Sequence, residues 1–290
     1  MNWKFVEHSR NVHQLNIHLG DPSEEVYVLL QSDVHWDNPH CDREMLAEHL
    51  EEAKRRNAPV LDIGDFFDVM QGKYDPRSSK SDLRPELMCG DYLDECVNQA
   101  SEWIAPYASQ LCLRGYGNHE TSIKKRHETD LIERLSERLR AQGSPARTGG
   151  YSGFVRISVF PTKNPKFQQG VKYFYHHGYG GGGPVTRGTI QTSRQAVYLS
   201  DADVVHNGHT HDAWVMPIQR IRLSTANTIM HERQVHVRTP GYKEEYQDGH
   251  GGWHIERGGP PKPTGGAWLR LRCARVKDVW RLESDIIEAR

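Results

Sequence analysis

Short apolar runs alternate with amphipathic segments along the first half of the chain. Runs rich in Val, Leu and Ile predict buried strands. These runs cover 25–31, 59–63 and 110–114. Apolar residues three and four positions apart predict helices at 42–56, 86–104 and 128–140, with Asp42 as a candidate cap of the first. Such alternation is typical of parallel strands joined by helical crossovers, so the first half predicts a β-α-β arrangement.

The pattern changes near residue 150, after which strands predominate. The expected strands cover 154–160, 171–176, 203–206, 214–223, 234–238 and 267–272, and the best helical pattern covers 191–199. A long stretch rich in Gly, Pro and charge predicts that the C-terminal part, from about residue 224, is rich in loops. The 290 residues would suit two domains, but we predict a single domain over 1–290 in which the change marks two halves of one sandwich.

Composition narrows the classes of function. Lys and Arg number 37 and Asp and Glu 38, so a net charge of −1 gives no global attraction to nucleic acid or to an acidic membrane. No apolar run approaches the roughly 18 residues that span a bilayer, and we expect no membrane partner. The five cysteines are widely spaced, which disfavours a disulfide framework and predicts a reduced, cytoplasmic protein.

Five polar motifs each follow a run that is predicted to be a strand. They are Asp33-Val34-His35, Gly64-Asp65-Phe66-Phe67-Asp68, Gly117-Asn118-His119-Glu120, His176-His177-Gly178 and Gly208-His209-Thr210-His211. In open α/β sheets, ligands bind beyond the carboxyl ends of the strands, so we expect the five motifs to meet at one rim. Each motif alone would also fit ordinary turn or helix-capping chemistry. The five together favour a shared site.

The residue types in these motifs indicate metal binding. Asp33 and His35 are two positions apart, as are His209 and His211, and such pairs face one way in extended backbone. Carboxylates, an amide and imidazoles together suit Mn²⁺, Fe, Zn²⁺ or Ni²⁺ better than Ca²⁺ or an iron–sulfur cluster. The donors are too many for one tetrahedral zinc site. Two metals that share a carboxylate would use them all.

The motif series D-x-H, G-D-x-x-(D/H), G-N-H-(D/E), H-G and G-H-x-H resembles that of the calcineurin-like metallophosphoesterases. All five motifs occur in order within residues 26–212. The resemblance implies a four-layer α/β/β/α sandwich with two divalent transition-metal ions. Mn²⁺ is the first choice, with Fe, Zn²⁺ or Ni²⁺ as alternatives.

The resemblance also implies a role for each matching residue. The first metal would be held by Asp33, His35, Asp65 and His211. The second would be held by Asp65, Asn118, His177 and His209, so that Asp65 bridges the two. His119 would contact the substrate and protonate the leaving oxygen, and Asp68 would orient His119. The family ligand in the fourth motif directly precedes Gly, which selects His177, whereas a shift of one residue would select His176.

These implications predict a phosphoesterase, with a phosphodiester as the leading substrate and nucleic acid as a candidate partner. The segment around Asn118 is similar to the L-R-G-N-H-E of the protein-phosphatase branch, but Tyr116 and Gly117 are inserted. Val69 and Met70 also replace that branch's Arg-Gly, which disfavours a phosphoprotein. The alternatives are a phosphomonoesterase acting on a nucleotide or phosphoprotein, and a non-catalytic binding module. The oligomeric state stays open.

Overall fold

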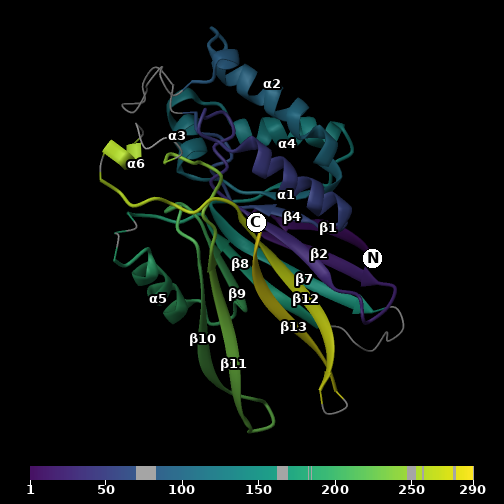
Figure 1. Cartoon of the computed structure of the whole chain (residues 1–290). Helices are drawn as coiled ribbons and strands as arrows, with labels where there is room; N and C mark the ends of the chain where they lie inside the picture. The colour runs from purple at the N-terminus through teal and green to yellow at the C-terminus, as the bar shows by residue number, and fades with distance from the viewer. Residues whose placement is uncertain are drawn as a thin grey trace.

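Two β-sheets lie face to face in the computed structural model of the chain, with helices on their outer sides (Figure 1). The structure describes residues 1–69, 83–161, 169–181, 183, 185–246, 253–256, 258–276 and 279–289. The expected four-layer α/β/β/α sandwich is therefore confirmed, with four helices over one sheet and one helix over the other.

The six-stranded sheet contains the parallel strands of the first half. Its order is β13-β12-β3-β4-β5-β6, in which β3 to β6 are parallel and β12 and β13 are antiparallel. The strands are Val26–Gln31 (β3), Val60–Asp62 (β4), Leu111–Arg114 (β5), Arg147–Thr148 (β6), Gly266–Val276 (β12) and Val279–Ala289 (β13). The helices over this sheet are Arg43–Arg55 (α1), Tyr92–Ile104 (α2), Asn118–His127 (α3) and Leu131–Ala141 (α4).

The seven-stranded sheet has the order β1-β2-β7-β8-β9-β11-β10. Its strands are Asn2–Ser9 (β1), Val12–Leu19 (β2), Ser152–Pro161 (β7), Gln169–His176 (β8), Val204–Asn207 (β9), Trp214–Leu223 (β10) and Ile229–Arg238 (β11). Thr189–Tyr198 (α5) lies on its outer side, and Trp253–Glu256 (α6) is one turn between β11 and β12. None of the helices in the described residues has the length and apolar character needed to cross a membrane.

Burial on both faces explains why β3 is an unbroken apolar run. Val28 and Leu30 point between the sheets, into the cluster that also contains Leu15 of β2. Leu29 points the other way and packs among Leu46 and Leu50 of α1. Parallel strands that are covered on both faces lose the usual alternation of polar and apolar residues, which is the pattern found here.

Four strands are not predicted from the sequence pattern. β6 has only two residues, and in β1, β2 and β13 charged or polar residues on the outer faces interrupt the apolar signal. On the hairpin of β12 and β13 these charges pair across strands, for instance Arg272 with Glu283 at 2.8 Å. From residue 224 on, the described part of the chain contains three long strands, β11 to β13, and its irregular backbone lies at 224–228, 239–246 and 258–265.

The helices also differ from the pattern. The predicted helix 86–104 is α2, which begins only at Tyr92, and α3 is not predicted. The predicted helix 128–140 is α4, which begins later because Asp130 caps it by accepting a hydrogen bond from the Glu133 N–H at 3.0 Å. Glu128 has a left-handed φ of 52° and ends α3. The first predicted helix is confirmed, since Asp42 accepts a hydrogen bond from the Met45 N–H at 2.9 Å.

Candidate metal centre

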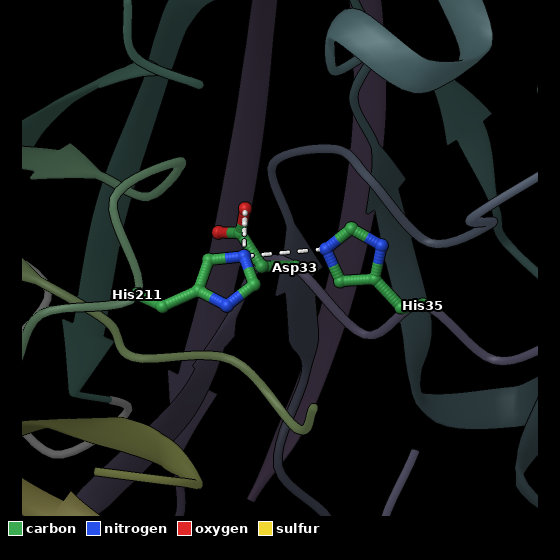
Figure 2. Close-up of side chains that lie close together, drawn as sticks. All are labelled: Asp33, His35 and His211. Carbon is green, nitrogen blue, oxygen red and sulfur yellow. Dashed lines mark hydrogen bonds and ion pairs between the residues drawn. The ribbon is translucent and has the colours of Figure 1, made fainter. Parts of the chain in front are cut away.

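The motif residues meet where strands of both sheets end. Each of two groups has its potential ligand atoms within 4.8 Å of one another, and these groups are Asp33, His35, His211 and Asp65, His177, His209. A third group of His35, Asp65 and His119 links the first two. The first group is shown in Figure 2, where the side chains of Asp33 and His35 both reach the His211 ring.

Asp33 uses its two carboxylate oxygens in different ways. Oδ2 accepts a hydrogen bond from the His209 backbone N–H at 2.8 Å, which ties the end of β3 to the loop after β9. Oδ1 lies 3.4 Å from His211 Nε2 and 3.9 Å from His177 Nε2. His35 Nε2 is 3.3 Å from the same His211 nitrogen. One oxygen thus fixes the side chain, and the other faces the imidazoles.

Asp65 has the same arrangement. Its Oδ1 accepts a hydrogen bond from the His119 backbone N–H at 3.0 Å. Its Oδ2 lies 3.1 Å from His177 Nε2 and 3.8 Å from His119 Nε2. Asp65 belongs to the second and third groups, and His35 belongs to the first and third.

Glycines in the motifs leave room for these carboxylates. A Cβ at Gly117 would lie 1.9 Å from Asp65 Oδ1, and one at Gly208 would lie 2.3 Å from Asp33 Oδ2. Both contacts are far inside van der Waals distance. The glycines before Asn118 and His209 are therefore required by packing against the candidate ligands.

The backbone at the site is strained, and the expectation that the paired motif residues lie on extended backbone is wrong. Pairs two residues apart were expected to face one way along extended chain, but Asp33 and His35 have φ values of 51° and 50°. Asp65, His209 and His211 also have φ between 53° and 71°. The chain leaves each strand before these residues and turns through left-handed conformations. Such residues cost about 1–3 kcal/mol each and gather at functional sites.

The two neighbouring histidines of the fourth motif have different surroundings. His177 is fully buried and belongs to the cluster. His176 is half-buried, and its Nδ1 accepts a hydrogen bond from the Gly178 N–H at 3.0 Å. Its ring packs against Tyr151 and Tyr179. The geometry thus brings His177, and not His176, to the other candidate ligands.

His119 and Asp68 are in contact, but mainly through the backbone. His119 Nδ1 lies 2.6 Å from the main-chain carbonyl oxygen of Asp68, which leaves Nε2 facing the cluster. The Asp68 carboxylate Oδ1 is 2.9 Å from His35 Nδ1 and 3.5 Å from His119 Nδ1. Asn38 donates to Oδ2 at 2.7 Å. Asp68 is therefore placed to orient a candidate metal ligand as well as His119, as outer carboxylates do for ligating histidines.

Charge on these groups favours a bound cation. Burial alone would raise the pKa of Asp65, but the nearby charge of His177, followed by that of His119, holds it well below its usual range. Burial opposes protonation of His177, yet the Asp65 and Asp33 carboxylates raise the pKa of His177 to about 9. Within the described parts of the chain, Asn118 Oδ1 and Asp33 Oδ1 are buried and have no hydrogen-bond partner. Buried acceptors of this kind fit metal ions.

Two buried acids support the site and have no role assigned from the sequence. Glu120 accepts hydrogen bonds from the backbone N–H groups of Asp65 at 3.1 Å, Phe67 at 3.0 Å and Gly117 at 2.9 Å. Asp37 accepts from the N–H groups of Asp68 at 2.6 Å and Val69 at 2.9 Å. Both clamp the turn that contains Asp65. Their place inside or next to a motif is the only signal of this in the sequence.

No family model matches the chain, and the comparison with curated proteins found no match. Among solved structures, the chain is similar to Vacuolar Protein Sorting 29 of Cryptosporidium parvum, with 11% identity, a TM-score of 0.39 and coverage of 91% of this chain and 98% of that one. Vps29 of Chaetomium thermophilum is similar with 6% identity, a TM-score of 0.36 and coverage of 91% and 96%.

A conserved uncharacterized protein of Streptococcus pneumoniae, described as a predicted phosphoesterase, is similar with 9% identity and a TM-score of 0.34, over 90% of this chain and 99% of that one. The chain resembles the calcineurin-like metallophosphoesterases. The resemblance rests on the five motifs and their order along the chain. Similarities at these identities and TM-scores carry no information about activity.

Proposed function

We propose that the protein is a phosphoesterase that depends on two divalent transition-metal ions, with Mn²⁺ as the first candidate. The observation that supports this most is the pair of donor groups, Asp33–His35–His211 and Asp65–His177–His209, which are joined by a third group that contains Asp65. When bound, two such metals would activate water and neutralise the charge of a phosphoryl group. We also propose that residues 1–290 form one domain around this site.

The chain's own residues would perform the remaining tasks. Asp33 and Asp65 each hold one oxygen toward the cluster, while backbone N–H groups fix the other. His119 is held at Nδ1 by the Asp68 carbonyl oxygen, so its Nε2 can carry the proton that a leaving oxygen needs. Asn118 Oδ1 would complete the second metal's ligands. The buried acids Glu120 and Asp37 keep the turn of Asp65 from moving during turnover.

The substrate class is proposed as a phosphodiester, with nucleic acid among the candidates and a phosphomonoester as the alternative. The test compares the hydrolysis of bis(p-nitrophenyl) phosphate and p-nitrophenyl phosphate by protein loaded with Mn²⁺. We expect metal-dependent hydrolysis with the diester as the better substrate. A higher kcat/KM for the monoester would reverse the preference. Full metal loading without hydrolysis of either ester would favour a non-catalytic binding module.

A further inference from the structure

A segment outside all five motifs forms part of the rim of the metal centre. Residues 239–246 run beside the loop that follows β3, and Tyr242 donates its N–H to the Asp33 carbonyl oxygen at 3.0 Å. The Tyr242 carbonyl oxygen accepts from the Asp42 N–H at 2.8 Å. The Tyr242 side chain is fully buried, and its hydroxyl contacts His49 Nδ1 and Gln31 Nε2, each at 2.9 Å. The segment is therefore fixed to the loop that contains Asp33 and His35.

Lys243 extends from this segment toward Asp68. Its ammonium lies 2.9 Å from Glu245 Oε1 and 4.0 Å from Asp68 Oδ1. The same Asp68 oxygen is 2.9 Å from His35 Nδ1 and 3.5 Å from His119 Nδ1. The Lys243 side chain is only 12% exposed. A cation is thus held beside Asp68, the carboxylate that contacts both His35 and His119.

The position of this charge has a chemical consequence. At 4.0 Å the Lys243–Asp68 pair is too long for a hydrogen bond, so the two interact through charge. Burying an ammonium is costly unless an anion pairs with it, and Glu245 supplies that anion on the side of the segment itself. A lysine held beside a metal cluster is a point-charge ligand for phosphate oxygens.

We propose that Lys243 binds an anionic oxygen of the substrate's phosphoryl group next to His119. This proposal rests on the proposed phosphoesterase function and names a binding residue that the five motifs do not contain. Lys243 is assigned to substrate binding and not to proton transfer. Its loss would therefore act mainly on KM and on the affinity for phosphate.

A second lysine offers a matched control. Lys262 comes from the same C-terminal region, its side chain is 10% exposed, and its ammonium lies 2.8 Å from Asp212 Oδ1, next to His211. Removing Lys262 takes one positive charge from beside Asp212, the residue that follows His211. If phosphate affinity depends only on the net charge of the protein, the two substitutions will lower that affinity equally. If Lys243 contacts the phosphoryl group, Lys243→Met alone will weaken its binding.

The experiment titrates inorganic phosphate into Mn²⁺-loaded protein by calorimetry and measures KM and kcat for p-nitrophenyl phosphate. For Lys243→Met we expect phosphate affinity to fall and KM to rise, each about 10-fold, with unchanged metal content, as for a lost charge-assisted hydrogen bond. Lys243→Arg should restore most of the affinity, and Lys262→Met should stay near wild type.

Wild-type phosphate affinity in Lys243→Met would overturn the proposal, as would an equal loss in Lys262→Met. A tenfold fall in kcat with unchanged KM and unchanged phosphate affinity would also overturn it. The titration needs no turnover, so it separates the two proposals. A wild-type protein that binds phosphate through Lys243 but hydrolyses no ester would support Lys243 and contradict the phosphoesterase function.

Discussion

The two sheets contribute different chemistry to the candidate metal centre. The segments that follow strands of the six-stranded sheet supply all the proposed oxygen donors, which are Asp33, Asp65 and Asn118, the first residue of α3. Loops of the seven-stranded sheet supply imidazoles only, which are His177, His209 and His211. Each of the two main donor groups takes residues from both sheets. A metal in either group would therefore join the sheets at this edge.

Away from this edge, the described residues between the sheets are mainly apolar. They form an apolar cluster in which each fully buried aliphatic side chain, such as Leu15, Ile17 or Leu61, contributes about 1.5–3 kcal/mol. Apolar packing therefore brings the sheets together, whereas the polar edge depends on positions fixed by backbone hydrogen bonds. Substitutions on either sheet should then disturb the same metals, while proton transfer depends on one sheet alone.

The largest expected effect concerns His119 on the six-stranded side. His119→Ala should keep its metals and lose about 10²–10⁴-fold in rate, since a general acid typically contributes that much. The loss should shrink for a nitrophenolate leaving group, which needs little protonation. Kinetics with good and poor leaving groups, together with metal analysis, check this. Loss of metal, or equal losses with both leaving groups, would make His119 a ligand or a binding residue.

Gly117→Ala tests whether the glycines of the six-stranded side are required by the carboxylates. The new methyl would overlap Asp65 Oδ1 and displace it, and a shift of about 1 Å in a catalytic group can cost about 10²-fold in rate. We expect that loss together with weaker metal binding. Gly90→Ala is the control, because a Cβ at Gly90 meets nothing within 4 Å. Equal activity of the two variants would show that the site tolerates the displacement.

His177→Ala tests the contribution of the seven-stranded side. Loss of this proposed ligand should lower the affinity for one metal by at least about 10–100-fold, the range seen even for supporting residues. His176→Ala is the matched control and should bind metal almost normally, since His176 lies outside the described ligand groups. Titration of each variant with Mn²⁺ measures the difference. The opposite ranking would mean that the motif is shifted by one residue.

The smallest effect is expected between the sheets, away from the metals. His13 of β2 is fully buried, and burial, together with the charge of Arg147 across the interface and of His8, lowers its pKa to about 4. The unfolded chain binds a proton below its ordinary pKa of 6.5, whereas the folded chain does so only near 4. Stability from this residue is therefore present above about pH 6.5 and is lost as the pH falls toward 4.

His13→Phe removes this titration and keeps a ring beside Phe5, which stacks on His13 at 5.3 Å. Urea unfolding at about pH 7.5 and about pH 5 should show a smaller loss of the free energy of unfolding in the variant than in the wild type. An equal loss of the free energy of unfolding in both proteins would show that His13 does not contribute to acid sensitivity.

The sequence predicts the meeting of the five motifs because parallel strands end at a common edge, and β3, β4 and β5 do so. It also predicts α1 with its Asp42 cap, since helix capping is a local property. The left-handed backbone at Asp33 and His35 is not predicted. Those conformations depend on hydrogen bonds from distant loops, such as the His209 N–H to Asp33.

Contacts between residues far apart in the chain that support the site are also not predicted from the sequence. Lys243 approaches Asp68 only because Tyr242 fits beside α1 and β3, which no periodicity in the chain records. β13 is missed because its outward residues pair with arginines of β12, so the strand has the charge content of a loop. Motifs that follow strand ends can be recognised in the sequence, whereas residues that approach the site from a separate hairpin or segment cannot.

The most direct test of the account is the number of metal ions that the protein binds with and without the Asp65 carboxylate. The wild type, saturated with Mn²⁺ and then desalted, should retain about two ions per chain by elemental analysis. Asp65→Asn should have lower metal occupancy at both sites, because Asp65 would bridge the two ions. A wild type that binds one ion or none, or an Asp65→Asn variant that binds both with unchanged affinity, would contradict a dinuclear centre held between the two sheets.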